Sequence, residues 1–188
     1  MSEETFFFKD RKEFEKWLSE NFGKSPGVWV RMYKKNSGVE AIKGPEMLDV
    51  LLCYGWITGQ ARKGNEDYAL WRVCPRRKKS IWSKINIGHA ERLIREGRMK
   101  PSGMKEIEEA KTDGRWERAY SSQKNAALPE DFLKEIEKNK KAKEFLKTLN
   151  KPNTYAIIFR IENAKTPEKR KEKIRQMIEM LERGEKFH

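Results

Sequence analysis

The strongest strand pattern of the chain is Val28-Trp29-Val30-Arg31-Met32-Tyr33, which is rich in β-branched and aromatic residues. A second run of the same character, Tyr68-Ala69-Leu70-Trp71-Arg72-Val73-Cys74, stops at Pro75, which cannot donate to a strand ladder. Phe6-Phe7-Phe8 could add a short third strand. We expect these segments to form a small antiparallel sheet in the N-terminal half.

Helical periodicity surrounds these strands. Phe14, Trp17 and Leu18 recur at the i, i+3, i+4 spacing of an amphipathic helix. Pro45 is well placed as a first helical residue before an apolar run that stops at Gly55. Two further helices are expected near the middle of the chain, at 82–96 and 103–112, and a loop-rich stretch at 56–65.

The C-terminal part is predicted to be entirely helical. A small, polar segment from Ser121 to Pro129 reads as a linker, and four amphipathic patterns follow it. The last begins at Thr166-Pro167-Glu168, with a capping hydroxyl, a proline at the first helical position and an acid in the first turn. We therefore expect an α+β fold, mostly helical, with a core over residues 1–125 and a helical part over 126–188 packed on it.

Composition indicates a folded protein with a heavily charged surface. The 188 residues are 37% hydrophobic and 38% charged, with a net charge of +13. Six Trp, five Tyr and nine Phe argue against disorder, because large rings gain most from burial. Nothing in these numbers names a reaction.

The positive charge is unevenly distributed. Residues 1–56 carry nine basic and nine acidic side chains, whereas residues 57–127 carry seventeen and nine. The densest stretch runs from Arg62 to Lys84, where the acids are Glu66 and Asp67. An anionic partner would be attracted to this stretch first.

Targeting and redox features are few. No apolar run approaches the roughly 18 residues of a membrane span, and the start Met1-Ser2-Glu3-Glu4 lacks the basic region of a signal peptide. We expect a cytoplasmic location and no membrane insertion. Cys53 and Cys74 are expected to be free thiols. The sequence leaves the oligomeric state open.

The catalytic inventory is poor. Of the two histidines, His188 ends the given sequence, and His89 lies on a predicted helix, where a packing or surface role is the commoner one. The two cysteines have no neighbouring ligands for a tetrahedral zinc site, and no glycine-rich phosphate loop occurs. We therefore expect no metal and no nucleotide cofactor, and we favour a protein that is not an enzyme.

Several turns combine tryptophan with basic residues. Arginine offers a planar fork of donors for carboxylate or phosphate and also stacks on indole rings, so the pair suits an anionic or aromatic ligand. Each segment also has a structural interpretation as a turn, a core tryptophan or a solvated charged face. The candidate ligand-binding residues are Trp56, Arg76, Trp82, Lys84, Asn86, Arg115 and Trp116.

The chain resembles the YdeI/OmpD-associated family, some of whose members are described as bacteriocin-protection proteins. The resemblance spans most of the chain, and its most specific part is the pattern Pro-Arg-Arg…Ser-x-Trp-Ser-Lys-x-Asn. The matching segments are Tyr54-Gly55-Trp56-Ile57-Thr58-Gly59-Gln60, Pro75-Arg76-Arg77 with Ser80-Ile81-Trp82-Ser83-Lys84-Ile85-Asn86, Gly97-Arg98-Met99-Lys100-Pro101-Ser102-Gly103, Ala110-Lys111-Thr112-Asp113-Gly114-Arg115-Trp116 and Ala164-Lys165-Thr166-Pro167-Glu168-Lys169-Arg170.

The resemblance implies an association with a porin and with tolerance of antimicrobial peptides, without a catalytic mechanism. The family usually has an acid where this chain has Thr58, and an Asp is common at the position of Asn65. Both differences remove a carboxylate that could act as a general acid or base.

Three functions are consistent with these patterns. The first is a stress-tolerance protein that binds a small anionic or aromatic ligand in a Trp/Arg cleft. The second is a nucleic-acid-binding protein with a basic, aromatic-interleaved surface, in keeping with a sequence pI near 9.7. The third is an enzyme that uses Asp113 or Glu66 on a substrate held by Arg76 or Arg115.

Overall fold

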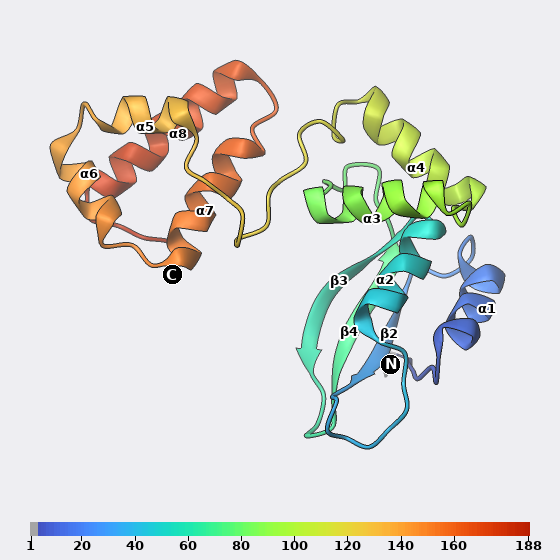
Figure 1. The fold of residues 1–188 in the computed structure, drawn as a ribbon. Helices are drawn as coiled ribbons and strands as arrows, with labels where there is room; N and C mark the ends of the chain where they lie inside the picture. Colours follow the sequence, from blue (N-terminus) through green and yellow to red (C-terminus); the bar gives the residue numbers. More distant parts are fainter. Residues whose placement is uncertain (1–3) are drawn as a thin grey trace. The chain divides into compact units, whose positions relative to one another are not determined.

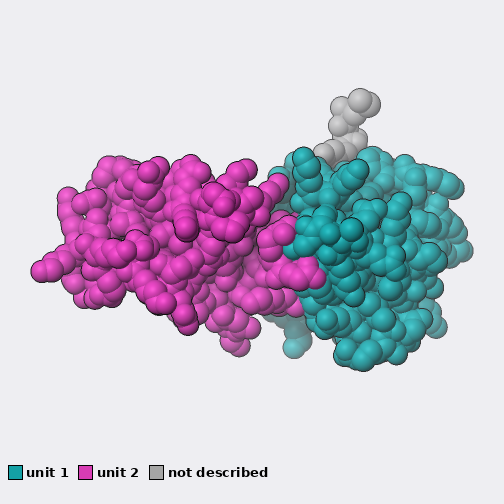
Figure 2. All heavy atoms as spheres, turned by 90° about the horizontal axis from the view of Figure 1, so that it is seen from above, with its two compact units in different colours: residues 1–80, 86–116 teal, residues 81–85, 117–188 magenta. Residues whose placement is uncertain are grey.

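The computed structural model describes residues 4–188, which divide into two compact units, coloured separately in Figure 2. Unit 1 consists of the described residues up to Ser80 and of Asn86–Trp116. Unit 2 consists of Ile81–Ile85 and Glu117–His188. The chain therefore passes between the units more than once, and it leaves unit 1 for the last time after Trp116.

Unit 1 contains a sheet and four helices among its described residues, apart from Lys84 and Ile85 at the start of α3 (Figure 1). The elements in chain order are β1 (Thr5–Phe6), α1 (Arg11–Asn21), β2 (Val28–Tyr33), α2 (Gly44–Cys53), β3 (Trp56–Lys63), β4 (Tyr68–Pro75), α3 (Lys84–Arg95) and α4 (Pro101–Thr112).

The sheet is mixed, which corrects the expectation of an antiparallel sheet. Its strand order is β1-β2-β4-β3, with β2, β4 and β3 antiparallel to their neighbours and β1 parallel to β2. The reason lies in the connection: α1 carries the chain back along the sheet between β1 and β2, and such a crossover joins parallel strands. The α+β class itself is confirmed.

Strand β3 lies where the sequence predicted a loop, so that prediction was wrong. Its residues include Gly59 and Gln60, and most of the strand is exposed, so the local pattern is weak. The strand is stabilised by its pairing with β4 from Trp56 to Lys63, although its local strand propensity is low. The predicted strands at 28–33 and 68–74 are confirmed as β2 and β4.

One face of this sheet forms the core of unit 1. Val30 and Val73 are fully buried on it. Trp56 lies at 1% exposure, meets Trp17 of α1 edge-on at 6.2 Å between ring centroids, and donates its indole N–H to the Phe22 carbonyl at 3.1 Å. Helices α1 and α2 lie on this side of the sheet (Figure 1). We call it the covered face.

The turn after α2 shows why glycine follows that helix. Gly55 adopts a φ of 77°, in the left-handed region that other residues rarely occupy. A Cβ there would also lie 3.0 Å from the Ser102 carbonyl oxygen at the start of α4. The helix ends before Gly55, as predicted, but it begins at Gly44, one residue before Pro45, which the sequence placed as the first helical residue.

Unit 2 is a helical unit with its own apolar core. Its helices are α5 (Glu130–Ile136), α6 (Lys140–Lys147), α7 (Lys151–Glu162) and α8 (Pro167–Glu182). Thr166 caps α8 by accepting the Lys169 N–H at 3.3 Å, as its sequence predicted. The buried core residues are Phe132, Ile136, Ala142, Ile157, Ile161, Ile174, Met177 and Leu181.

Among residues 4–188, no helix combines the length and the apolar character needed to cross a bilayer.

Candidate anion-binding groove

The second face of the sheet carries aromatic and basic side chains. Residues directly opposite each other on paired strands share a face, and a strand's residues alternate between faces. Because Trp29 pairs with Arg72 and Tyr33 with Tyr68, these four side chains lie together, opposite the covered face. Arg31 shares this face through its pairing with Leu70. We call it the aromatic face.

A β-bulge interrupts β3 on this face. The pairing passes from Thr58 with Val73 to Ala61 with Trp71, so Gly59 and Gln60 together oppose Arg72. A bulge bends its strand and redirects the side chains around it, and such irregularities are frequent beside binding sites. Here the bulge forms part of the wall of a groove.

The groove lies between β3, β4 and the residues that follow β4, and has a volume of about 640 Å³. This size falls within the usual range of small-ligand sites, about 300–1,000 Å³. Four arginines line it, and none of the described lining residues is acidic. The lining residues are Pro26, Trp29, Ile57, Gly59, Gln60, Arg62, Arg72, Cys74, Pro75, Arg76, Arg77 and Ser80.

Contacts within the groove hold two of its cationic groups in place. The Arg62 guanidinium lies over the Trp29 ring, 4.2 Å from its centroid. Arg72 donates to the Pro26 carbonyl at 3.3 Å. Across residues 4–188, neither Arg72 nor Arg77 forms an ion pair with a carboxylate. Arg72 and Arg77 therefore give the groove positive charge that no carboxylate in residues 4–188 neutralises.

Trp29 adds a buried hydrogen-bond donor to the groove. Its side chain is only 3% exposed, and its indole N–H finds no acceptor among the described residues. A buried donor without a partner is costly, about 1–3 kcal/mol. The ring of Trp29 lines the groove, and its N–H lies beneath the surface.

Arg76 connects the groove to a second buried arginine. Arg76 and Arg115 are 6% and 9% exposed, and both donate to the Ser80 carbonyl, at 3.4 Å and 3.0 Å. The Arg115 Nε also donates to both carboxylate oxygens of Asp113, at 2.6 Å and 2.9 Å. Asp113 therefore neutralises and orients Arg115.

Glu106 of α4 lies in the field of these two arginines. Burial raises the pKa of the Glu106 carboxyl above its ordinary value, and the charge of Glu109 adds to the rise. The charges of Arg76 and Arg115 oppose it without cancelling it. One carboxylate oxygen of Glu106 is buried without a hydrogen-bond partner in the described part of the chain.

The structure brings together two of the seven predicted site residues, Arg76 and Arg115, at the Ser80 carbonyl. Trp56 packs in the core on the covered face, so we do not include it in the groove. Trp82 and Lys84 belong to unit 2, where Trp82 is buried and Lys84 is exposed.

The remaining two predicted residues belong to unit 1. Asn86 is half-buried near the start of α3. Trp116 is half-buried after α4, with the Lys111 ammonium 5.3 Å from its ring centroid.

Sequence reasoning did not select Trp29, Arg62, Arg72 or Arg77 as binding residues. The signal that could have found them is the alternation within β2. Val28, Val30 and Met32 are apolar, whereas Trp29, Arg31 and Tyr33 between them are aromatic or basic. Such a pattern gives a strand one core face and one face of different chemistry.

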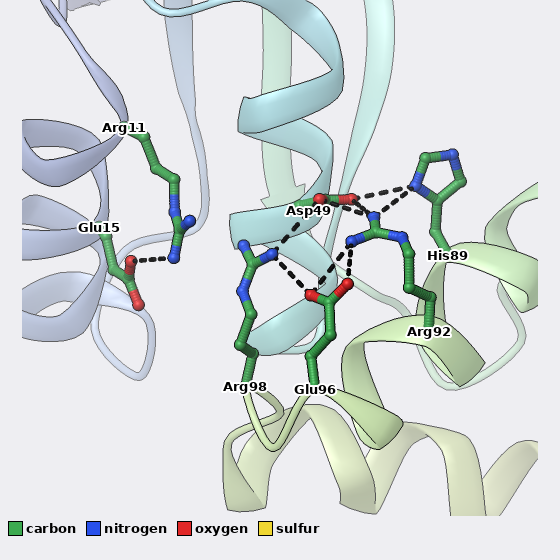
Figure 3. Close-up of polar contacts among 7 residues, drawn as sticks. All are labelled: Arg11, Glu15, Asp49, His89, Arg92, Glu96 and Arg98. Atoms are coloured by element: carbon green, nitrogen blue, oxygen red, sulfur yellow. Dashed lines mark hydrogen bonds and ion pairs between the residues drawn. The ribbon is translucent and has the colours of Figure 1, made fainter.

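A second charged cluster in unit 1 has the opposite character (Figure 3). Asp49 of α2 accepts from Arg92 at 2.6 and 2.7 Å and lies 3.0 Å from the His89 Nδ1. Glu96 accepts from Arg92 at 3.1 Å and from Arg98 at 3.0 Å. In this Asp49 network, acids and arginines neutralise one another and join α2 to α3.

The Asp49 network also lowers a carboxyl pKa. Burial alone would raise the pKa of Asp49, but the hydrogen bonds from Arg92 and His89 and the charges of both outweigh burial. The pKa of Asp49 therefore lies below its usual value. His89, the one histidine that the sequence offered for catalysis, contributes to this ion-pair network.

Metal-ligating and thiol groups are scattered in the described residues. Between positions 4 and 188, no three His, Cys, Asp or Glu side chains come together in a way that could hold a metal ion. Cys53 and Cys74 are free thiols, as predicted. Burial raises the pKa of the Cys53 thiol, so it is a poor nucleophile.

The fold and the groove define a class: an α+β unit with a basic groove on its sheet, in a chain that also contains a helical unit. The chain belongs to the family described as "Domain of unknown function (DUF8412)", whose model matches residues 6–106. Residues 125–184 match the model described as "Bacteriocin-protection, YdeI or OmpD-Associated". No curated protein and no solved structure matches the chain.

The second match confirms the resemblance to the YdeI/OmpD-associated family in the C-terminal part. Of the quoted motifs, only Ala164–Arg170 lies inside it. The segments from Tyr54 to Gly103 lie inside the DUF8412 match.

Proposed function

We propose that unit 1 is a binding module for anionic ligands and that the groove on the aromatic face is its binding site. The observation that carries this proposal is the four-arginine lining without an acidic side chain. The groove makes this positive charge accessible to a ligand between the β3 bulge and the residues after β4.

The chemistry of the lining suits phosphate. Arginine forks form two parallel hydrogen bonds to phosphate or carboxylate, and such charge-assisted bonds are about twice as strong as neutral ones. Arg72 and the exposed Arg77 supply such forks at the groove. The Trp29 ring and the Arg62 guanidinium stacked on it add an aromatic and cationic wall. A phosphate attached to an aromatic ring fits these features.

A binding role is better supported than a catalytic one. Asp113, one of the two carboxylates considered for catalysis, is engaged by Arg115 at 2.6 Å. The other, Glu66, is exposed in the turn between β3 and β4. Neither lines the groove, so neither supports the enzymatic hypothesis.

Two broader expectations stay proposals. A role in stress or bacteriocin tolerance rests on the description of the family that matches residues 125–184. A cytoplasmic location is likewise a proposal.

The direct test is isothermal titration of the full chain with inorganic phosphate, sulfate and a nucleoside monophosphate, at low salt and at about 0.15 M salt. The variant is Arg72→Ala with Arg77→Ala. The matched control is Lys78→Ala with Lys79→Ala, which removes the same charge from exposed side chains of the neighbouring loop.

We expect saturable binding of the nucleoside monophosphate, weakened at least tenfold by the arginine pair and little changed by the lysine pair. Two results would overturn the proposal. One is an equal loss of affinity in both variants, which would show attraction to charge in general, and the other is no binding to the wild-type chain.

A further inference from the structure

The groove occupies only one end of the aromatic face. Toward the β3–β4 turn, the Tyr33 and Tyr68 rings lie 5.4 Å apart, and Phe7 meets Tyr33 edge-on at 5.4 Å. The Arg31 guanidinium lies 5.9 Å from the centre of the Tyr68 ring. The face therefore continues from the groove as a second set of rings accompanied by an arginine.

These rings are accessible, unlike the residues on the covered face. Phe7 is 38% exposed, and Tyr33 and Tyr68 are half-buried. Strand β4 carries the face from Cys74 to Tyr68, a length of roughly 20 Å at about 3.3 Å per residue. Rings and guanidinium groups alternate over a distance far longer than one small ligand.

Two arginines on the aromatic face have no carboxylate partner among the described residues and can bind an anion. Neither Arg31 nor Arg72 forms an ion pair anywhere in residues 4–188, and the Arg31 guanidinium only reaches the Thr5 hydroxyl, at 3.5 Å. The acids nearest in sequence, Glu66 and Asp67, lie in the turn beyond Tyr68 and limit the positive surface at that end.

We propose that the aromatic face binds single-stranded nucleic acid, with phosphates on Arg72, Arg77 and Arg31 and bases stacked on the rings. This inference rests on the proposed function, because the groove would hold one phosphate of the strand. Proteins that bind single strands combine a positive groove with aromatic platforms, and a four-stranded sheet can stack two or three bases on such rings.

The chemistry of the face separates a single strand from other polyanions. An acidic peptide would neutralise the arginines but would offer few flat rings to the tyrosines. A duplex also brings phosphates, but its bases are already stacked inside and cannot reach the protein's rings. Only a single strand uses the charges and the rings together.

The experiment is fluorescence anisotropy of the full chain with labelled single-stranded oligonucleotides and with a duplex of the same length. The test variant is Tyr33→Leu with Tyr68→Leu, which keeps apolar bulk but removes the π-faces. Phe22→Leu is the control, because Phe22 is an exposed ring at the end of α1, whose backbone carbonyl accepts from Trp56 on the covered face.

We expect the oligonucleotide to bind more tightly than a nucleoside monophosphate, more tightly than the duplex, and more weakly as salt increases. The tyrosine pair should weaken binding roughly tenfold, and Phe22→Leu should leave it unchanged. Ultraviolet crosslinking of a halogenated-uracil oligonucleotide to the wild-type chain needs no variant, and it should mark Phe7, Tyr33 or Tyr68.

The outcomes separate this inference from the proposed function. If the monophosphate binds in the groove but the oligonucleotide binds no better, or the tyrosine pair has no effect, the single-strand inference is overturned and the anion site remains. Equal binding of the duplex, or crosslinks only outside the aromatic face, would also overturn it. If neither ligand binds, both proposals fail.

Discussion

Unit 1 contains two arginine-rich regions, and the arginines have a different role in each. In the Asp49 network, Arg92 and Arg98 meet Asp49 and Glu96 within hydrogen-bond or ion-pair distance (Figure 3). In the groove, four arginines come together and no described lining residue is acidic. The first region neutralises its own charge, whereas Arg72 and Arg77 in the second keep charge for a partner.

The difference shows that the number of arginines is a poor guide to a binding site. A paired arginine contributes to stability and has little attraction left for a ligand. An arginine without a carboxylate partner repels its neighbours in the folded protein and is compensated only by solvent or by a bound anion. Removing a charge from the Asp49 network should therefore lower the free energy of unfolding, whereas removing a charge from the groove should leave it unchanged.

The largest expected effect is that of Asp49→Asn. Asp49 is 14% exposed at its side chain and accepts charged hydrogen bonds from Arg92. Hydrogen bonds to charged groups contribute about 1.5–3 kcal/mol, so the free energy of unfolding should fall by about 2 kcal/mol. Denaturant unfolding of the full chain measures it. Glu15→Gln, which breaks the looser 3.4 Å pair with Arg11, should cost less than about 0.5 kcal/mol. Equal losses in the two variants would contradict the structural role of Asp49.

The groove variant Arg72→Ala with Arg77→Ala should show the reverse pattern. A tenfold weaker binding of nucleoside monophosphate corresponds to about 1.4 kcal/mol. Stability should change by less than about 0.5 kcal/mol, because neither side chain forms an ion pair. Titration and denaturant unfolding of the same preparation measure both. A loss of stability comparable to that of Asp49→Asn would show that the groove arginines are structural.

The pH dependence of stability should also distinguish the network. Because the pKa of Asp49 is lower in the folded state than its ordinary 3.8, its ionised form contributes stability above that value. This contribution is lost as the pH falls through 3.8 toward the folded value. The stability difference between wild type and Asp49→Asn should therefore shrink in this range. A difference that stays constant with pH would contradict the assignment.

The smallest effect is expected at Glu106. Its pKa is raised by burial, so its ionised form is disfavoured in the folded state, and stability falls as the pH rises through 4.5 toward the folded pKa. Glu106→Gln should be slightly more stable than wild type near neutral pH, and the gain should vanish below pH 4.5. Thermal unfolding at several pH values measures it, with the exposed Glu108→Gln of the same helix as control. A loss of stability at neutral pH would show that Arg76 and Arg115 need the charge.

Much of the fold could be predicted from local patterns. Strands β2 and β4, the proline in the first turn of α2 and the cap at Thr166 all follow from short stretches of sequence. Strand β3 could not be predicted, because Gly59 and Gln60 lower its strand propensity and it forms only through pairing with β4 in the folded protein. The direction of β1 likewise depends on how α1 returns the chain.

Less of the candidate site could be predicted. The sequence identified Arg76 and the basic stretch around it, but it gave Trp56 the role that Trp29 is placed to fill. Both are tryptophans in strands, and only the register shows that they face opposite sides of the sheet. The bulge opposite Arg72 also depends on pairing, so no local pattern contains it.

The most direct test of the central claim is the indole N–H spectrum of the six tryptophans during titration with a nucleoside monophosphate. Trp29 lines the groove and its buried N–H has no acceptor among residues 4–188, whereas the Trp56 N–H is bonded to Phe22 in the core at 3.1 Å. A bound anion should shift the Trp29 signal in a saturable way and leave the Trp56 signal in place. Saturable binding that leaves Trp29 unchanged would contradict the assignment of the groove.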